Sequence, residues 1–306
     1  MIKEKILVLG ASGFIGLHLC EKLLDQGFNT IALVRNNGSE NVKKLLKMGI
    51  EVDFIGDLFK KKKFKKNYCN INYVINLAAL AHVSSKKSSF DNKNQNNLET
   101  NIIRNFSNKN LKIIHISSAK VSEKNKNYSQ YAVIKKNGER LIRNFYKKHI
   151  ILRPPLIYGP FVKANFLSLI KIVEKNYPLP FKSINNKRSY MYIDNLTDAI
   201  IYILKNQHFY GRTYYISDGC TLSTTKLIEL IGSCLDKKVF LFRLPRYAFK
   251  VFFNLISKPD IFNKLLGDFK VSNKNFVADT RWKPPYHYKY GFKKTCLWYK
   301  RRFNIS

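Results

Sequence analysis

Seven residues near the N-terminus, Gly10 to Gly16, constrain this chain more than any other stretch. They read Gly-Ala-Ser-Gly-Phe-Ile-Gly, follow the apolar run 6–9 and precede an amphipathic run that ends at Gly27. An apolar run, a glycine turn, a helix and a second apolar run at 30–34 are typical of a βαβ unit. The sequence therefore predicts a doubly wound sheet of parallel strands that begins at the N-terminus.

Each glycine of this turn has its own physical reason. Gly10 permits the tight turn, Gly13 lets a pyrophosphate approach the backbone, and Gly16 lets the helix pack closely against the strand. The first turn of the helix also offers free N–H groups and a positive dipole end to phosphates. We therefore predict a dinucleotide site, against the simpler interpretation of a tight turn without a ligand. The predicted contacts are Gly10, Ser12, Gly13, Phe14, Ile15 and Gly16.

The residue after the second predicted strand indicates which dinucleotide is bound. An acidic residue commonly accepts hydrogen bonds from the adenosine ribose at this place, whereas this chain carries Arg35. A guanidinium suits a 2′-phosphate, which it binds through paired, charge-assisted hydrogen bonds. The sequence therefore favours NADP(H) over NAD(H), with a solvated surface arginine as the alternative.

A serine, a tyrosine and a lysine follow in a consistent order. Ser118 ends the apolar run 111–117, and ligands of doubly wound sheets bind outside the carboxyl ends of strands. Tyr131 and Lys135 open the next predicted helix and lie four residues apart, so both side chains face the same way. The G-x-x-G-x-x-G spacing, this serine and the Tyr-x-x-x-Lys motif together resemble the short-chain dehydrogenase/reductase superfamily.

The later motifs resemble one branch of that superfamily, the extended enzymes of the NAD-dependent epimerase/dehydratase family. The stretch 153–160 resembles its RPxxxYGP signature, 186–199 its RxxxxVxDxxxA segment, and 281–299 its closing GWxP…GLxxTxxWY segment. The resemblance runs from about residue 5 to about residue 300. Within the family, the stretch 153–195 is most similar to bacterial surface-polysaccharide nucleotide-sugar 4-epimerases and 4-ketoreductases.

The resemblance implies the roles of individual side chains. Tyr131 would be the acid/base, with its pKa lowered by the ammonium of Lys135 and by the charge of the nicotinamide. Lys135 would also hold the ribose hydroxyls, and Ser118 would stabilise charge on the substrate oxygen. The segment between Ser118 and Tyr131 is about half the family's length, which leaves the role of Ser118 more open than that of Tyr131. Further cofactor contacts are implied at Asp57, Leu58, Leu77, Ala78, Ala79 and Pro154.

Two residues of the second half are implied as substrate contacts beside Ser118 and Tyr131. Asn165 would contact the diphosphate or base of a nucleotide sugar, and Arg188 would clamp one of its phosphates, unless it is an ordinary surface arginine. His82 is a weaker candidate for substrate contact. We expect reduction of a UDP-4-keto-6-deoxy-N-acetylhexosamine by NADPH for surface glycan synthesis. The alternative is a UDP-sugar 4-epimerase, similar to UDP-glucose 4-epimerase, with tightly bound NAD.

The resemblance also implies the architecture. It is a Rossmann-type doubly wound parallel sheet with a smaller α/β substrate-binding lobe. We expect a cofactor domain at 1–165 and a nucleotide-sugar lobe at 166–306, with part of 185–215 packing back on the first domain. A homodimer through the helix that carries Tyr131 is a further implication of the family.

Composition bounds the remaining classes of function. The net charge is +35, but the basic residues are spread over the chain and accompany a richness in Asn and Ile, which indicates compositional bias rather than a nucleic-acid partner. No apolar run approaches the ~18 residues of a membrane span, and the five cysteines lack metal-ligand spacing. We therefore expect a cytoplasmic protein with no metal and no transmembrane segment. The aromatic stretch 247–257 leaves peripheral membrane contact open as an alternative to a helix of the lobe.

Overall fold

The computed structural model describes most of the chain, and its compact units are made of interleaved segments. The described residues are 4–60, 63–64, 66, 68, 70–79, 97–122, 130–206, 209–245, 247–249 and 266–305. The candidate His82 and most of the stretch 247–257 lie outside them. The first compact unit comprises residues 1–154, 197–215 and 274–282, and the second comprises 155–196, 216–273 and 283–306.

The first unit is built on a seven-stranded sheet with the order β3-β2-β1-β4-β5-β6-β9, in which every neighbouring pair is parallel. The order reverses beside β1, and ligands of such sheets bind outside the carboxyl ends of the strands at that point. The expected Rossmann-type doubly wound sheet is confirmed. Its strands are β1 (Lys5–Leu9), β2 (Asn29–Val34), β3 (Glu51–Phe54), β4 (Tyr73–Asn76), β5 (Lys112–Ile116), β6 (His149–Arg153) and β9 (Arg212–Tyr215).

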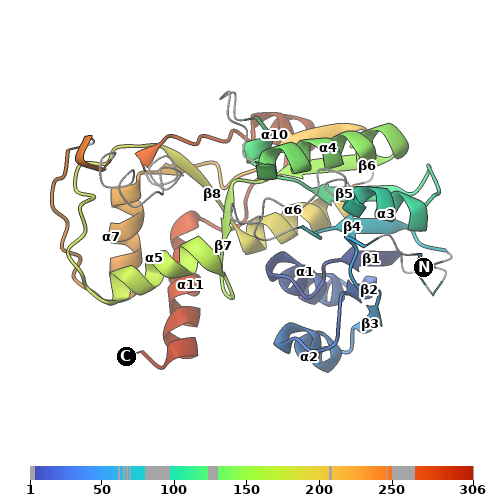
Figure 1. The fold of residues 1–306 in the computed structure, drawn as a ribbon, viewed down its shortest axis with the longest axis horizontal. Coiled ribbons are helices and arrows are strands. Elements are labelled where there is room, and N and C mark those ends of the chain that lie inside the picture. The colour runs from blue at the N-terminus through green and yellow to red at the C-terminus, as the bar shows by residue number, and fades with distance from the viewer. Residues whose placement is uncertain are drawn as a thin grey trace. The chain divides into compact units, whose positions relative to one another are not determined.

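Helices cover both faces of this sheet, which explains why its central strands are almost entirely apolar. The helices α1 and α2 lie on one face, and α3 and α4 lie on the other (Figure 1). Leu7, Val74 and Ile113 of the strands are fully buried in one core with Ile102 of α3 and Ile142 of α4. The helices are α1 (Phe14–Asp25), α2 (Glu40–Lys47), α3 (Asn97–Asn105), α4 (Gln130–Phe145), α6 (Ile193–Lys205) and α10 (Lys274–Thr280), with a 3₁₀ turn, η2 (Ala119–Ser122).

The second unit contains a three-stranded sheet of order β10-β8-β7 and three described helices. Its strands are β7 (Leu156–Tyr158), β8 (Arg188–Tyr192) and β10 (Thr221–Leu222), and its helices are α5 (Ala164–Glu174), α7 (Thr224–Cys234) and α11 (Tyr288–Phe303). A buried aromatic cluster joins β7 to α11, where the rings of Tyr158 and Phe292 stack with centroids 4.3 Å apart.

The largely buried carboxylate of Asp218 links residues of this aromatic cluster through hydrogen bonds. It accepts hydrogen bonds from the backbone N–H of Tyr192 (3.0 Å), the side-chain amide of Asn195 (2.8 Å) and the hydroxyl of Tyr158 (3.1 Å). Burial raises the pKa of Asp218 from its ordinary 3.8 to about 6, although these three donors oppose the rise. The folded state of this unit is therefore sensitive to mildly acidic pH.

We expected a division at residue 165 with part of 185–215 packing back on the first domain, whereas in the structure the first unit ends at Pro154 and regains 197–215 and 274–282. The segment 197–215 belongs to the first unit because β9 pairs in parallel with β6 and extends the sheet by one strand. That strand covers Arg212–Tyr215. No helix among the described residues combines the length and the apolar character that crossing a membrane requires.

Candidate active site

The glycine turn after β1 forms a cradle of open backbone. Gly10 has a φ of +79°, and a Cβ there would lie 2.9 Å from the backbone nitrogen of Ala78. A Cβ on Gly16 would lie 2.4 Å from the carbonyl oxygen of Gly10, so the start of α1 needs glycine to pack on the turn. The turn and the stretch after β4 are thus brought together, as the cofactor prediction requires.

The N-terminus of α1 has no side-chain cap among the described residues. Its N-cap residue is Gly13, no side chain caps the helix, and no acidic residue lies in its first turn. The first backbone N–H groups of a helix have no partner within it and carry partial positive charge. The residues Ser12, Gly13, Phe14 and Ile15 therefore suit a dinucleotide pyrophosphate, and the cofactor implied by the sequence fits this part of the chain.

The predicted adenine-side residues lie beyond the neighbouring strands. Arg35 follows β2 directly and is exposed. Asp57 accepts a hydrogen bond from the backbone N–H of Phe59 (3.0 Å), so its carboxylate shapes the turn that carries Leu58. The side chain of Asn101 on α3 fastens the same turn by donating to the carbonyl oxygens of Leu58 (2.8 Å) and Lys60 (2.9 Å).

Ser118, Tyr131 and Lys135 converge on the end of β5. The ammonium of Lys135 donates to the carbonyl oxygen of Ile116, the last residue of β5, at 3.0 Å. Ser118 comes two residues later, and its side chain hydrogen-bonds the hydroxyl of Tyr131 in the first turn of α4. Pro154 fixes this end of the strand, because its carbonyl oxygen accepts from the backbone N–H of Ala119 at 2.9 Å.

The electrostatics of Tyr131 differ from our expectation. Burial raises the pKa of its hydroxyl, and the hydrogen bond with Ser118 is what opposes this rise. The expected lowering by Lys135 is not found because that ammonium points at the carbonyl of Ile116. Burial also lowers the pKa of Lys135, while the nearby carboxylates of Glu99 and Glu139 raise it.

Glu99 is a buried carboxylate that the sequence analysis missed. It lies on α3 and is 3% exposed, and a Cβ on Gly138 of α4 would come within 2.6 Å of its carboxyl carbon. Burial raises the pKa of Glu99, while the ammonium of Lys135 opposes the rise. A charged residue among the apolar positions of a helix was the signal available in the sequence, but its approach to Gly138 was not.

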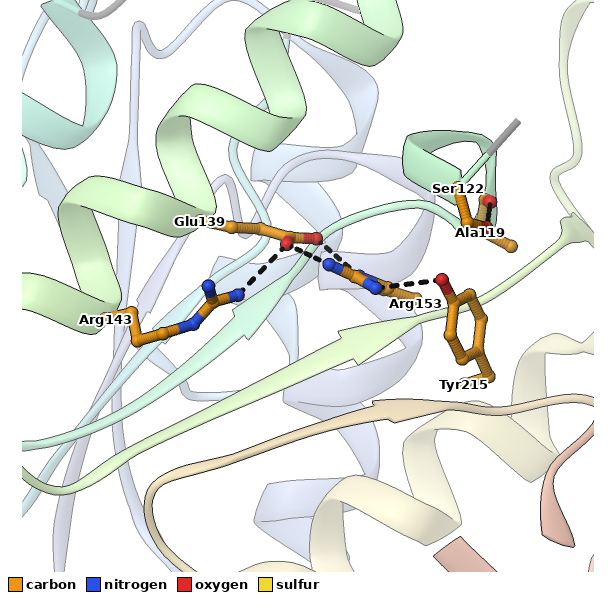
Figure 2. A network of polar contacts seen from close by, with 6 residues as sticks. All are labelled: Ala119, Ser122, Glu139, Arg143, Arg153 and Tyr215. Atoms are coloured by element: carbon orange, nitrogen blue, oxygen red, sulfur yellow. Dashed lines mark hydrogen bonds and ion pairs between the residues drawn. The ribbon is translucent and has the colours of Figure 1, made fainter. Parts of the chain in front are cut away.

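A second buried carboxylate, Glu139, joins α4 to the sheet. Arg153 of β6 donates from Nε to Oε1 of Glu139 (2.8 Å) and from Nη2 to Oε2 (2.5 Å), in a bidentate pair. Figure 2 shows Arg153 between Glu139 and Tyr215, whose hydroxyl accepts from Nη1 at 2.8 Å. Since Glu139 lies one helical turn beyond Lys135, this network sets the position of the helix that carries Tyr131.

A polar pair lies beneath the stretch Leu77, Ala78 and Ala79. The amide nitrogen of Asn76 lies 2.9 Å from Nδ1 of His115, and the amide oxygen accepts from the backbone N–H of Ala78 at 3.1 Å. Burial, and then the charge of Lys135, hold the pKa of His115 well below its usual value. This imidazole is therefore neutral and orients Asn76, which in turn fixes the backbone that faces Gly10.

The two predicted substrate residues belong to the second unit. Asn165 is exposed near the start of α5. Arg188 donates from Nη1 to the carbonyl oxygen of Gly267 at 2.7 Å, and its guanidinium carbon lies 5.8 Å from the ring centre of Phe269. In the same unit, a cavity of about 460 Å³ is lined by Ser183, Ile184, Asn185, Asn186 and Asp268.

Comparison with known proteins defines the class of enzyme. The sequence profile of the NAD dependent epimerase/dehydratase family matches residues 6–217, so the chain belongs to this family. It is an NAD(P)-dependent nucleotide-sugar enzyme of the extended short-chain dehydrogenase/reductase type, which confirms the resemblance predicted from its motifs.

Individual relatives span nearly the whole chain. A UDP-glucose 4-epimerase of Vibrio cholerae is 29% identical and covers 96% of this chain and 94% of its own length. An N-acetyl-alpha-D-glucosaminyl-diphospho-ditrans,octacis-undecaprenol 4-epimerase of Escherichia coli O157:H7 is 25% identical over 92% of this chain and 87% of its own. The structure of a UDP-glucuronic acid 4-epimerase from Bacillus cereus, in complex with NAD, has a TM-score of 0.70 at 21% identity, covering 98% and 99% of the two chains.

Proposed function

We propose that this protein reduces the 4-keto group of a UDP-4-keto-6-deoxy-N-acetylhexosamine with NADPH, as a step in surface glycan synthesis. The observation that carries the proposal is the convergence of Ser118, Tyr131 and Lys135 on the end of β5. A hydroxyl acid, a second hydroxyl and a buried ammonium are the groups that carbonyl reduction needs, because the oxygen must gain a proton as the carbon gains a hydride.

Each of the three residues has a distinct task. Tyr131 delivers its hydroxyl proton to the sugar oxygen, and Ser118 donates a hydrogen bond to the same oxygen and stabilises the charge that develops there. Lys135 holds the ribose hydroxyls of the cofactor, and the hydrogen bond of Ser118 favours the ionised form of Tyr131 after proton transfer. A bound nicotinamide supplies the hydride. The cradle at Gly10 to Gly16, with Asp57, Leu58 and 77–79, would hold the cofactor.

The choice of NADPH rests on Arg35. Its exposed guanidinium follows β2, where a 2′-phosphate would lie in a dinucleotide fold, and the residues next to it in the sequence include no Asp or Glu to accept from a ribose hydroxyl. The solved epimerase from Bacillus cereus holds NAD, so this preference is a property we propose for this chain alone.

The second unit supplies a candidate site for the nucleotide part of the substrate. The cavity at Ser183 to Asn186 is polar, and the carboxylate of Asp268 on its wall can accept hydrogen bonds from ribose hydroxyls. Arg188 is anchored beside Asp268 through the carbonyl of Gly267. We propose that its guanidinium and the side chain of Asn165 bind the diphosphate and that the cavity takes the nucleoside.

A 4-epimerase is the second candidate, and it is favoured by the Vibrio cholerae relative, a UDP-glucose 4-epimerase over nearly the whole of both chains. The same three residues would serve, with Tyr131 taking the proton from the sugar hydroxyl in the first half of the reaction and returning it in the second. Epimerisation consumes no cofactor overall, whereas reduction consumes one NADPH for each sugar.

Absorbance separates the two candidates. The purified protein is mixed with NADPH and UDP-4-keto-6-deoxy-N-acetylglucosamine, and the absorbance of NADPH is followed. The proposal expects a rapid loss, equal in amount to the sugar that is reduced. If NADPH is unchanged while UDP-glucose and UDP-galactose interconvert without added cofactor, the protein is an epimerase. If neither occurs, the proposed substrate class is wrong.

A further inference from the structure

Two extended segments of the second unit lie side by side at an exposed edge. The backbone N–H of Leu179 donates to the carbonyl of Phe240 (2.8 Å), and the N–H of Phe242 donates back to the carbonyl of Leu179 (3.0 Å). A third bond runs from the N–H of Lys182 to the carbonyl of Phe242 (3.1 Å). These bonds fix a short parallel pairing, centred on Leu179 and Leu241.

The pairing turns aromatic side chains toward solvent. Side chains alternate along an extended chain, so Lys238, Phe240 and Phe242 share one face while Leu241 lies on the other. Leu179 is buried, whereas Phe240 is 50% exposed and Phe242 is 45% exposed. Half-exposed phenylalanines at two successive positions of one face give an apolar strip that the described residues leave partly exposed.

Basic residues accompany this strip in the sequence, and neither of the two segments contains a carboxylate. No Asp or Glu occurs at 175–193 or at 237–259. The ammonium of Lys238 lies 5.7 Å from the ring centre of Phe240. Six exposed side chains of the two segments, from both faces of the pairing, are together called the aromatic–basic edge: Tyr177, Lys182, Lys238, Phe240, Phe242 and Arg243.

We propose that the aromatic–basic edge docks on the surface of an anionic lipid bilayer. Aromatic rings are favoured at the depth of the headgroups, where one side of the ring is apolar and the other is wet. Lysine and arginine next to them reach anionic headgroups while their stems lie along the acyl boundary. A second copy of this chain is less suited to bind this edge, because two positively charged edges repel each other.

The test uses vesicles of phosphatidylcholine with and without phosphatidylglycerol, and sedimentation of the whole protein with them at about 0.15 M salt. With a net charge of +35, some diffuse binding to anionic vesicles is expected from any variant. The informative variant is therefore F240S/F242S, which keeps every charge. The matched control is Phe54→Ser, which removes an equally exposed phenylalanine (52%) from β3 in the first unit.

We expect F240S/F242S to bind anionic vesicles at least about tenfold more weakly than the wild type, and Phe54→Ser to bind like the wild type. The variant K238E/R243E should also bind more weakly, and thermal unfolding of each variant separates lost docking from a loss of folding. The proposal is overturned if F240S/F242S binds as well as the wild type, because the attraction is then diffuse. It is also overturned if the wild type does not bind, or if these substitutions abolish only self-association measured by sedimentation velocity.

Discussion

At the scale of single residues, the buried carboxylate of Glu99 opposes the fall that burial causes in the pKa of Lys135. Burial alone lowers the pKa of Lys135, and Glu99 raises it again. In the variant Glu99→Gln this opposing charge is lost, so the pKa of Lys135 falls further and its ammonium loses its proton at a lower pH. We therefore expect the alkaline limb of the pH profile of kcat/KM to move to lower pH.

The control for this prediction is Glu229→Gln, which neutralises an exposed carboxylate paired with Lys226 on α7. That variant should keep the wild-type profile. A merely structural role of Glu99 would lower the stability and leave the limb of the profile where it is, and that outcome would contradict the role given to Glu99.

Arg35 carries the proposed preference for NADPH. Replacing it with serine removes a charge-assisted pair with the 2′-phosphate, an interaction of about 1.5–3 kcal/mol. The ratio of kcat/KM for NADPH to that for NADH should fall by at least about tenfold. Arg212→Ser, at an exposed position on β9, should leave the ratio unchanged. An unchanged ratio in Arg35→Ser would make Arg35 an ordinary surface arginine.

At the scale of elements, α4 is held in place by the ion pair between Glu139 and Arg153. Glu139 is 1% exposed, so the variant Glu139→Gln leaves the guanidinium of Arg153 half-buried without its counter-charge. We expect a loss of about 3–5 kcal/mol in the free energy of unfolding, measured with denaturant. The double variant E139L/R153M should recover part of it, because both charges are then absent. A loss below about 0.5 kcal/mol in Glu139→Gln, the range of ordinary surface substitutions, would contradict the importance of this pair.

At the scale of elements, local features could be predicted from the sequence, whereas contacts between distant segments could not. The turn from β1 into α1 is local, so the spacing of three glycines is enough to predict it. Tyr131 and Lys135 were likewise readable because they share one helix. The approach of Glu99 to α4 and the pairing of Glu139 with Arg153 join segments far apart in the chain, and no local pattern specifies such contacts. The wrong expectation for the pKa of Tyr131 has the same origin, because the direction of the Lys135 ammonium depends on tertiary packing.

At the scale of the whole molecule, the stability should depend on pH through Asp218. Its pKa is raised from 3.8 to about 6 in the folded state, so the folded chain keeps this proton when the unfolded chain has released it. The contribution is complete below about pH 4 and is lost as the pH rises from about 4 to 6, with a total of about 3 kcal/mol. The burial of Glu99 acts in the same direction.

Thermal unfolding at a series of pH values checks this prediction. Asp218→Asn keeps an acceptor for the N–H of Tyr192 but cannot ionise, so the change in Tm between pH 4 and 6 should be smaller in this variant than in the wild type. Equal changes in the two proteins would show that Asp218 does not titrate in this range.

The organisation of the chain into two interleaved units could be predicted only in part from the sequence. The sequence predicts a parallel sheet followed by a smaller lobe, but it does not indicate that residues 274–282 return to the first unit. That return depends on contacts such as the hydrogen bond from the indole of Trp282 to Asp198 (2.9 Å) and the one from Tyr202 to the carbonyl of Thr280 (2.5 Å). Contacts between residues so distant in the sequence depend on tertiary packing, which the periodicity of the sequence does not reveal.

The most direct measurement follows a deuterium label from cofactor to sugar. The protein is mixed with UDP-4-keto-6-deoxy-N-acetylglucosamine and NADPH deuterated on either face of the nicotinamide C4, and the product is analysed by mass spectrometry. We predict one deuterium at C4 of the sugar from one of the two faces. We also predict that Tyr131→Phe slows the transfer by about 10²- to 10⁴-fold, while Tyr177→Phe, at an exposed tyrosine, does not. No deuterium in the sugar from either face, or transfer at the wild-type rate in Tyr131→Phe, would contradict carbonyl reduction at this site.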